Sequence, residues 1–177
     1  MNKIFIEHSI GELIEKIKRH ELLPSELVAA SLQHINNDRN SAWVVHADES
    51  LITRTKAQEE NGIADEGLLS NIPLGVKDIY NTADFPTQMG SPLWKNFTPG
   101  NDARAVYNLK REGAVVIGKT VTAEFAVHAL NETLNPYDSA KTPGTSSSGS
   151  AVAVALGMVP AATGTQTAGS IVRPASF

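Results

Sequence analysis

The sequence has no cysteine and no long hydrophobic run. The absence of cysteine from its 177 residues excludes disulfides, thiolate metal sites and a cysteine nucleophile. No stretch approaches the roughly 18 apolar residues that a membrane span needs. The first eight residues already carry charges, unlike a secretory signal peptide. We therefore expect a cytoplasmic protein without a membrane partner.

Positive charge is also scarce. Lysine and arginine number 15 against 19 acidic residues, so the net charge is −4 and the isoelectric point about 5.7. Because nucleic-acid-binding proteins usually carry a basic patch, we expect no direct nucleic-acid partner. The five histidines lack the spacing of metal ligands, so we expect no metal. The apolar share of 41% and charged share of 19% are those of a globular protein of about one domain.

The amino-terminal part of the chain is predicted to be mainly helical. Apolar residues recur at helical spacing over residues 10–17 and 24–36. Residues 48–60 form a third predicted helix, and residues 42–45 a short strand before it.

From residue 70 onward, predicted strands alternate with helices. The strands lie at residues 74–76, 114–117 and 158–162, and the helices at 103–112 and 151–156. The run 114–117 is continuous and β-branched, as in a buried parallel strand. A helix followed directly by such a strand favours an α/β layer fold.

Hydroxyl side chains crowd into one short stretch. Five serines and threonines occupy residues 145–150, beside Gly144 and Gly149. A random stretch of this composition forms a flexible turn. Here an apolar helix and a second loop rich in Gly, Thr and Ser follow at once. This order favours two loops that lie side by side.

Known site patterns do not fit this stretch. A phosphate-binding loop would need lysine where Ser150 stands. The dinucleotide fingerprint G-x-G-x-x-G and the hydrolase serine elbow G-x-S-x-G are both absent. The remaining chemistry is a serine nucleophile activated by a lysine.

Lys77 is the candidate base for such a nucleophile. It follows the apolar segment Leu74-Gly75-Val76, and a lysine at the end of a buried strand loses hydration, which lowers its pKa. The alternative is a surface lysine paired with Asp78, which is the more common situation on spacing alone.

Residues 70–177 resemble the amidase signature family of serine hydrolases. The resemblance is carried, in the family's order, by residues 73–78, 113–120, 124–125, 135–136, 143–150 and 164–174. Residues 9–60 are similar to the family's helical amino-terminus. The combination is far more specific than any single segment.

The resemblance implies an α/β fold with a central mixed sheet flanked by helices. We expect residues 1–62 to form an amino-terminal helical segment of the same domain. Residues 63–177 are expected to form the amino-terminal part of the catalytic core. Because family domains continue far beyond this length, we expect a truncated, incomplete fold that lacks further strands and much of the substrate pocket.

The family's Ser-Ser-Lys triad falls on Lys77, Ser146 and Ser170. The resemblance makes Lys77 the base, Ser146 the bridging serine, with a cis peptide bond, and Ser170 the nucleophile. The two serines are 24 residues apart, as the family pattern requires. Ser147 is expected to support the loop through hydrogen bonds.

The resemblance also implies an oxyanion hole. It consists of backbone N–H groups, contributed by Thr167, Ala168, Gly169 and Ser170. The implied reaction is hydrolysis of a carbon–nitrogen bond through an acyl-enzyme, without metal or organic cofactor.

Several residues depart from the family pattern. Thr145 and Ser148 stand where glycine is usual, and Gln166 replaces an acidic residue. Ala168 replaces a glycine, and Arg173 directly precedes a proline that usually lies one residue further on. Thr145 is the most consequential change, because it adds a Cβ beside the bridging serine.

Three functions remain open. The first is a general amidase acting on a small-molecule linear amide. The second is the amidase subunit of a tRNA-dependent amidotransferase, which releases ammonia from glutamine or asparagine for a partner subunit. The short segment 125–135 and Gln166 favour the first. The third is an inactive fragment. A homodimer stays open as well.

Overall fold

The computed structural model describes residues 3–61, 67–127 and 129–177. The expected boundary between residues 62 and 63 lies outside the described residues.

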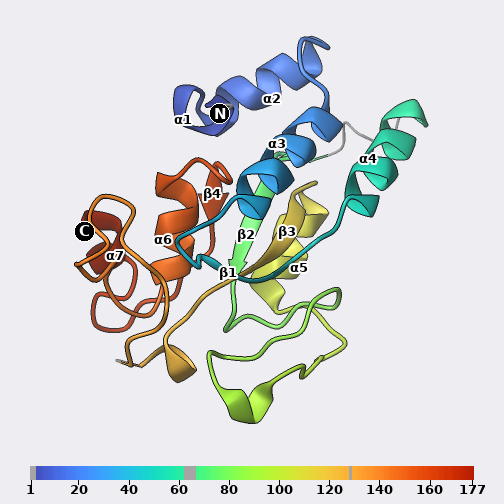
Figure 1. Cartoon of the computed structure of the whole chain (residues 1–177). Coiled ribbons are helices and arrows are strands. Elements are labelled where there is room, and N and C mark those ends of the chain that lie inside the picture. Colours follow the sequence, from blue (N-terminus) through green and yellow to red (C-terminus); the bar gives the residue numbers. More distant parts are fainter. Residues whose placement is uncertain (1–2, 62–66, 128) are drawn as a thin grey trace.

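A four-stranded mixed sheet forms the centre of the molecule, in the order β1-β3-β2-β4 (Figure 1). Strand β2 is parallel to β3 and β4, and β1 is antiparallel to β3. The strands are β1 (Trp43–His46), β2 (Pro73–Lys77), β3 (Val115–Thr120) and β4 (Ala161–Ala162). The predicted α/β class with a mixed sheet is confirmed.

Helices surround the sheet (Figure 1). They are α1 (Ile4–Glu7), α2 (Ile10–Lys18), α3 (Pro24–Asn36), α4 (Ser50–Glu60), α5 (Arg104–Arg111), α6 (Ser148–Ala155) and α7 (Val172–Ser176), with short 3₁₀ turns at Pro92–Trp94 and Glu124–Ala126. The helices predicted over 10–17, 24–36, 48–60 and 103–112 are confirmed to within two residues at each end. Among the described helices, none has both the length and the apolar character of a membrane span.

Apolar side chains hold helices against both faces of the sheet. Leu32 of α3 and Val152 of α6 pack in one cluster with Ile117 of β3. Val106 of α5 packs in another cluster with Val116 of β3. Consecutive strand residues point to opposite faces. Helices α3 and α6 therefore cover one face of the sheet, and α5 covers the other.

Helix α6 begins at Ser148, three residues before its predicted start. The serine- and glycine-rich composition predicted a loop up to Ser150, but residues 148–150 form the first turn of α6. Gly149 lies within this turn. A Cβ at Gly149 would come within 2.4 Å of the Ala42 carbonyl oxygen and the Val121 nitrogen. Glycine is therefore needed here for close approach of the helix to the strand ends, not for a turn.

The strand predicted over 158–162 is wrong in its first part, because β4 contains residues 161–162 alone. Met158 and Val159 are buried in the turn that follows α6, so their apolar character reflects packing in the core. The chain turns at Gly157, which has a φ of +62°. Helix α7 was not predicted, since Pro174 lies within it; proline is tolerated there because the first helical turn needs no N–H donor.

Candidate active site

Lys77 ends β2 with its side chain fully buried. All five residues of β2 are buried, and the relative exposure of Lys77 is 0%. The neighbouring Asp78 is also buried, and its carboxylate pairs with Lys119 at 3.0 Å. The alternative of a surface lysine paired with Asp78 is therefore wrong.

Three hydroxyl groups surround the Lys77 amine. Its Nζ lies 2.7 Å from Ser146 Oγ, 2.9 Å from Ser147 Oγ and 2.7 Å from Thr165 Oγ1. Because a hydroxyl can both accept and donate, this cluster accommodates either a charged or a neutral amine. Burial lowers the pKa of Lys77 to about 8, since desolvation disfavours the ammonium form. At pH 7, about one amine in ten is then neutral.

The hydroxyl-rich stretch is fixed from several sides. The Ala123 N–H donates to the Ser146 carbonyl at 3.3 Å. Ser150 Oγ lies 2.7 Å from Thr120 Oγ1 and donates to the Thr163 carbonyl at 2.8 Å. Residues 146–150 are all buried. The stretch is thus a packed part of the core, which excludes the flexible turn.

Ser147 joins the two loops. Besides contacting Lys77, its hydroxyl donates to the Thr165 carbonyl at 3.3 Å. Its backbone N–H donates to the Ser170 carbonyl at 3.2 Å. The two hydroxyl-rich loops therefore lie side by side, as the sequence predicts.

The backbone at Ser146 differs from the expectation. The resemblance implies a cis peptide bond, but the described residues contain none. Ser146 reaches Lys77 from a trans backbone, which is the lower-energy form for a residue other than proline. Thr145 is accommodated half-buried, and its carbonyl accepts the N–H of Ser148 at 2.9 Å.

Ser170 adjoins the cluster through its backbone. Ser170 is half-buried, and in the part of the chain that the structure describes its hydroxyl has no hydrogen-bond partner. The structure thus brings Lys77, Ser146 and Ser147 together. Within the described residues, no hydrogen bond joins the hydroxyls of Ser170 and Ser146.

The loop before α7 presents unpaired backbone donors. Across the described residues, the N–H groups of Thr167, Ala168, Gly169 and Ser170 donate to no acceptor. Gln166 shapes this loop, because its Oε1 accepts the N–H groups of Ile171 at 3.0 Å and Val172 at 2.9 Å. Glutamine therefore supplies the acceptor oxygen that an acidic residue would otherwise provide.

Thr165 is a member of the cluster that was not predicted from the sequence. A signal was present, because Thr165 lies in the second hydroxyl-rich loop, which was predicted to lie beside the first. The prediction named the backbone of that loop and overlooked its hydroxyls. The contact with Lys77 became visible only with the pairing of β2 and β4, which places this loop at the end of β2.

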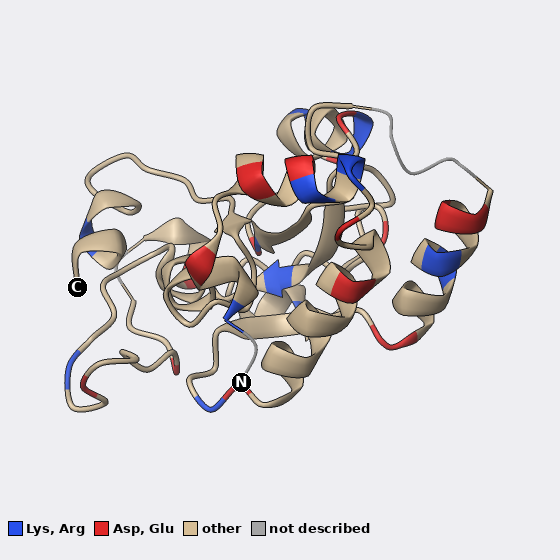
Figure 2. Ribbon diagram, turned by 90° about the horizontal axis from the view of Figure 1, so that it is seen from above, with Lys and Arg blue, Asp and Glu red and all other residues tan. Residues whose placement is uncertain are grey.

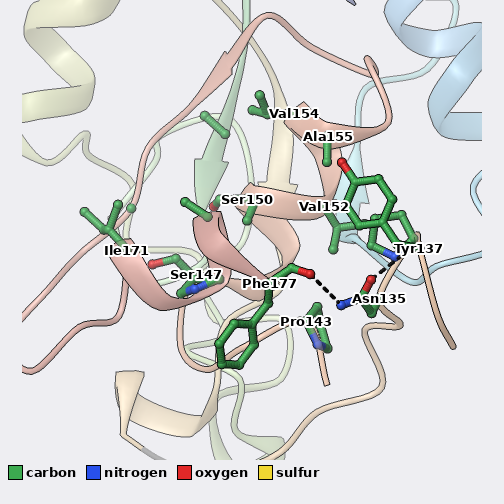
Figure 3. A pocket seen from close by; sticks show the side chains of 16 residues that line it. Asn135, Tyr137, Pro143, Ser147, Ser150, Val152, Val154, Ala155, Ile171 and Phe177 are labelled. Atoms are coloured by element: carbon green, nitrogen blue, oxygen red, sulfur yellow. Dashed lines mark hydrogen bonds between the residues drawn. The ribbon is translucent and has the colours of Figure 1, made fainter. Parts of the chain in front are cut away.

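A cavity of about 340 Å³ adjoins α6 on the side of Ser147 and Ser150 (Figure 3). Its lining is largely apolar and includes Tyr137, Pro143, Val152, Val154, Ile171 and Phe177. Asn135 closes one side, since its Nδ2 donates to the Phe177 carbonyl at 3.1 Å. The hydroxyl cluster therefore lies next to an apolar cavity.

Charged residues lie mostly on the outside. Acidic and basic positions are interspersed over the outer helices and loops (Figure 2). Among the described residues, no three His, Asp or Glu side chains are grouped so that they could hold a metal ion.

Comparison with known families identifies the chain. The Amidase family model matches residues 26–177, which include both hydroxyl-rich loops and Lys77. The chain belongs to the amidase family. Its relatives include a glutamyl-tRNA(Gln) amidotransferase subunit of Streptococcus pneumoniae (strain Hungary19A-6), which is 39% identical over 98% of this chain and 37% of that protein. The corresponding protein of Rhodopirellula baltica is 38% identical over 96% of this chain and 36% of that protein.

Solved amidase structures share the fold. The peptide amidase of Stenotrophomonas maltophilia superposes with a TM-score of 0.87 at 34% identity, over 98% of this chain and 39% of that chain. The glutamyl-tRNA(Gln) amidotransferase subunit of Thermotoga maritima gives a TM-score of 0.81 at 30% identity, over 99% of this chain and 38% of that chain. This amidase chain therefore spans less than two fifths of the length of such relatives.

Proposed function

We propose that this amidase chain carries a Ser-Ser-Lys relay that cleaves a linear amide through an acyl-enzyme. The observation that carries the proposal is the buried Lys77 amine, which contacts three hydroxyls. A buried amine with a pKa of about 8 is a base near neutral pH. Ser146, at 2.7 Å, is in position to receive and pass on a proton.

The proposed reaction begins with a proton transfer from Ser146 to neutral Lys77. Ser146 in turn takes the proton of Ser170, and the Ser170 oxygen attacks the amide carbon. The relay then returns a proton to the nitrogen as the carbon–nitrogen bond breaks. Water attacks the acyl-enzyme by the same route and frees the acid and Ser170.

The loop before α7 is proposed to stabilise the oxyanion. Its four N–H groups, from Thr167 to Ser170, are unpaired within the described residues and lie next to the nucleophile. In serine hydrolases, loss of one such donor costs about 2.7–4 kcal/mol of transition-state stabilisation. The hydrogen bond from the Ser170 hydroxyl to Ser146 Oγ is expected to form when substrate binds, because catalytic hydrogen bonds often tighten in the bound state.

A general amidase is favoured over an amidotransferase subunit. The short segment 125–135 supports this assignment, and so does the higher TM-score of the peptide amidase. The curated relatives at 39% identity are amidotransferase subunits, which supports the second candidate. That candidate would take its ammonia from glutamine or asparagine and pass it to a partner subunit. Co-purification with such a subunit would favour it.

Labelling with a fluorophosphonate tests the proposal. Serine attack on phosphorus releases fluoride and leaves an adduct that peptide mapping locates. We expect one adduct, on Ser170, which is lost in Ser170→Ala and strongly reduced in Lys77→Ala and Ser146→Ala. Lys141→Ala is the matched control, because its side chain is 76% exposed.

The experiment is run on the 177-residue chain and on a chain extended with the carboxyl-terminal remainder of the peptide amidase. Labelling of the extended chain alone would mean that the relay needs the remainder, and that the 177-residue chain is inactive. Absence of labelling in both, with intact folding, would overturn the Ser-Ser-Lys assignment.

A further inference from the structure

The sheet contains a second fully buried lysine that the proposed mechanism does not use. Lys119 lies on β3, and its relative exposure is 0%, as for Lys77. In the register of β2 and β3, Lys119 pairs with Val76, and Lys77 pairs with Thr120. Register partners share a face and consecutive residues alternate, so the two lysines point to opposite faces of the sheet.

The two lysines meet different kinds of partner. Lys119 Nζ lies 3.0 Å from an Asp78 carboxylate oxygen and 2.9 Å from the Tyr80 carbonyl. It also lies 3.1 Å from the Pro86 carbonyl and 2.8 Å from Thr87 Oγ1. Carboxylates and carbonyls only accept, so this site requires a protonated amine. Lys77, by contrast, contacts hydroxyls, which can hydrogen-bond to either the charged or the neutral amine.

Asp78 is held on the Lys119 side of the sheet. Both carboxylate oxygens accept the Gln88 N–H, at 3.2 and 3.1 Å. The backbone of Asp78 is fixed too, by its N–H to the Thr120 carbonyl and by its carbonyl to the Met89 N–H, both at 3.0 Å. The Asp78 carboxylate, although adjacent to Lys77 in the sequence, therefore forms its ion pair with Lys119.

Other charges on this face are paired elsewhere. Lys110 of α5 forms ion pairs with Asp84 and Asp102. Within the described residues, Asp78 is thus the charged group that Lys119 meets. Burial lowers the pKa of Lys119 and raises that of Asp78, and their ion pair opposes both shifts.

We propose that Lys119 is a positioning residue that holds the Asp78 carboxylate away from Lys77 and thereby leaves Lys77 free to act as the base. An unpaired carboxylate at position 78 would stabilise the ammonium form of Lys77 and withdraw it from proton transfer. The inference rests on the proposed function for its catalytic meaning. The order in which the two lysines lose their protons can be measured without an assay of enzyme activity.

The test is an NMR titration of chain labelled with ¹³C at lysine Cε, with Lys77 assigned from Lys77→Met. In the wild-type chain, we expect Lys119 to stay protonated at the pH where Lys77 loses its proton.

The variants should shift the Lys77 midpoint in opposite directions. In Lys119→Met, the Lys77 midpoint should rise by about one pH unit, because the carboxylate of the adjacent residue Asp78 loses its counter-charge. In Asp78→Asn it should fall, and in the double variant Asp78→Asn/Lys119→Met it should return close to the wild-type midpoint. Lys141→Met should change nothing.

Two results would overturn the proposal. One is a wild-type Lys119 that titrates at or below Lys77, which needs no variant to observe. The other is a folded Lys119→Met or Asp78→Asn whose Lys77 midpoint equals that of the wild type. If the midpoints behave as expected but no variant reacts with the fluorophosphonate, the positioning role stands and the proposed hydrolase function fails.

Discussion

Lys77 differs from an ordinary lysine because its amine is buried among hydroxyls instead of water or carboxylates. Burial lowers its pKa from the usual 10.5 to about 8. The folded chain therefore resists protonation of this amine more than the unfolded chain does. The free energy of folding must change with pH across the interval between the two values.

The sign of this pH effect follows from the proton counts. Between pH 8 and 10.5 the unfolded chain keeps the Lys77 proton that the folded chain has lost, so stability rises with pH. Relative to Lys77→Met, the wild-type chain should gain about 3 kcal/mol across this interval, since one pKa unit is worth about 1.4 kcal/mol. Urea unfolding at several pH values measures the difference. A flat difference between the wild-type chain and Lys77→Met would contradict the lowered pKa.

Thr165 gives a second prediction at this scale. Thr165→Val keeps the side-chain shape but removes the hydroxyl 2.7 Å from Lys77 Nζ. One such hydrogen bond is worth about 1 kcal/mol, so fluorophosphonate labelling should slow about fivefold to tenfold. Thr165→Ser restores the hydroxyl and should restore most of the rate. Equal rates for the valine and serine variants would show that this hydroxyl does not tune the amine.

The contacts of individual residues were only partly predictable from the sequence. Lys77 and Ser146 could be named from the resemblance, yet spacing alone favoured a surface lysine. The partner of Asp78 could not be predicted, because Lys119 lies on another strand and becomes its neighbour only through strand pairing. Ser147 was expected to support the loop, whereas its hydroxyl also contacts the amine at 2.9 Å.

At the scale of elements, α6 shows how close packing overrides local preference. Gly149 lies where a Cβ would meet backbone atoms at 2.4 Å, whereas Gly11 of α2 has no atom within 4 Å of the same position. Gly149→Ala should therefore lower the free energy of unfolding by about 1–3 kcal/mol. Gly11→Ala, the matched control, should raise it by about 0.5–1 kcal/mol through helix propensity. Thermal unfolding of both variants measures these changes in stability. A Gly149→Ala variant more stable than the wild type would contradict the packing of α6.

Element type was easier to predict than element extent. Helices α2 and α3 follow from regular apolar spacing, and the β-branched run of β3 indicated a buried strand. The start of α6 and the length of β4 were wrong, because serine, glycine and valine there respond to burial against other segments. Such long-range contacts leave no local pattern in the sequence.

At the scale of the whole molecule, apolar side chains remain exposed around α6 and α7. Phe177, which lines the apolar cavity, is 47% exposed, and Val172 of α7 is 62% exposed. The double variant Val172→Thr/Phe177→Ser should reduce binding of a hydrophobic dye such as ANS. Leu93→Ser should reduce dye binding less, although Leu93 is 86% exposed, because Leu93 does not line the apolar cavity. An equal reduction in both would show that these residues do not form a joint apolar surface.

The pH dependence of Ser170 labelling tests the Lys77 relay most directly. In the chain extended with the peptide amidase remainder, the rate should rise about tenfold per pH unit below pH 8 and level off above it, because the proposed relay starts from neutral Lys77. Lys77→Ala should abolish this rise, and Ser146→Ala should reduce the rate at every pH. A wild-type rate that does not change between pH 6 and 9, or an adduct on a residue other than Ser170, would contradict a relay driven by Lys77.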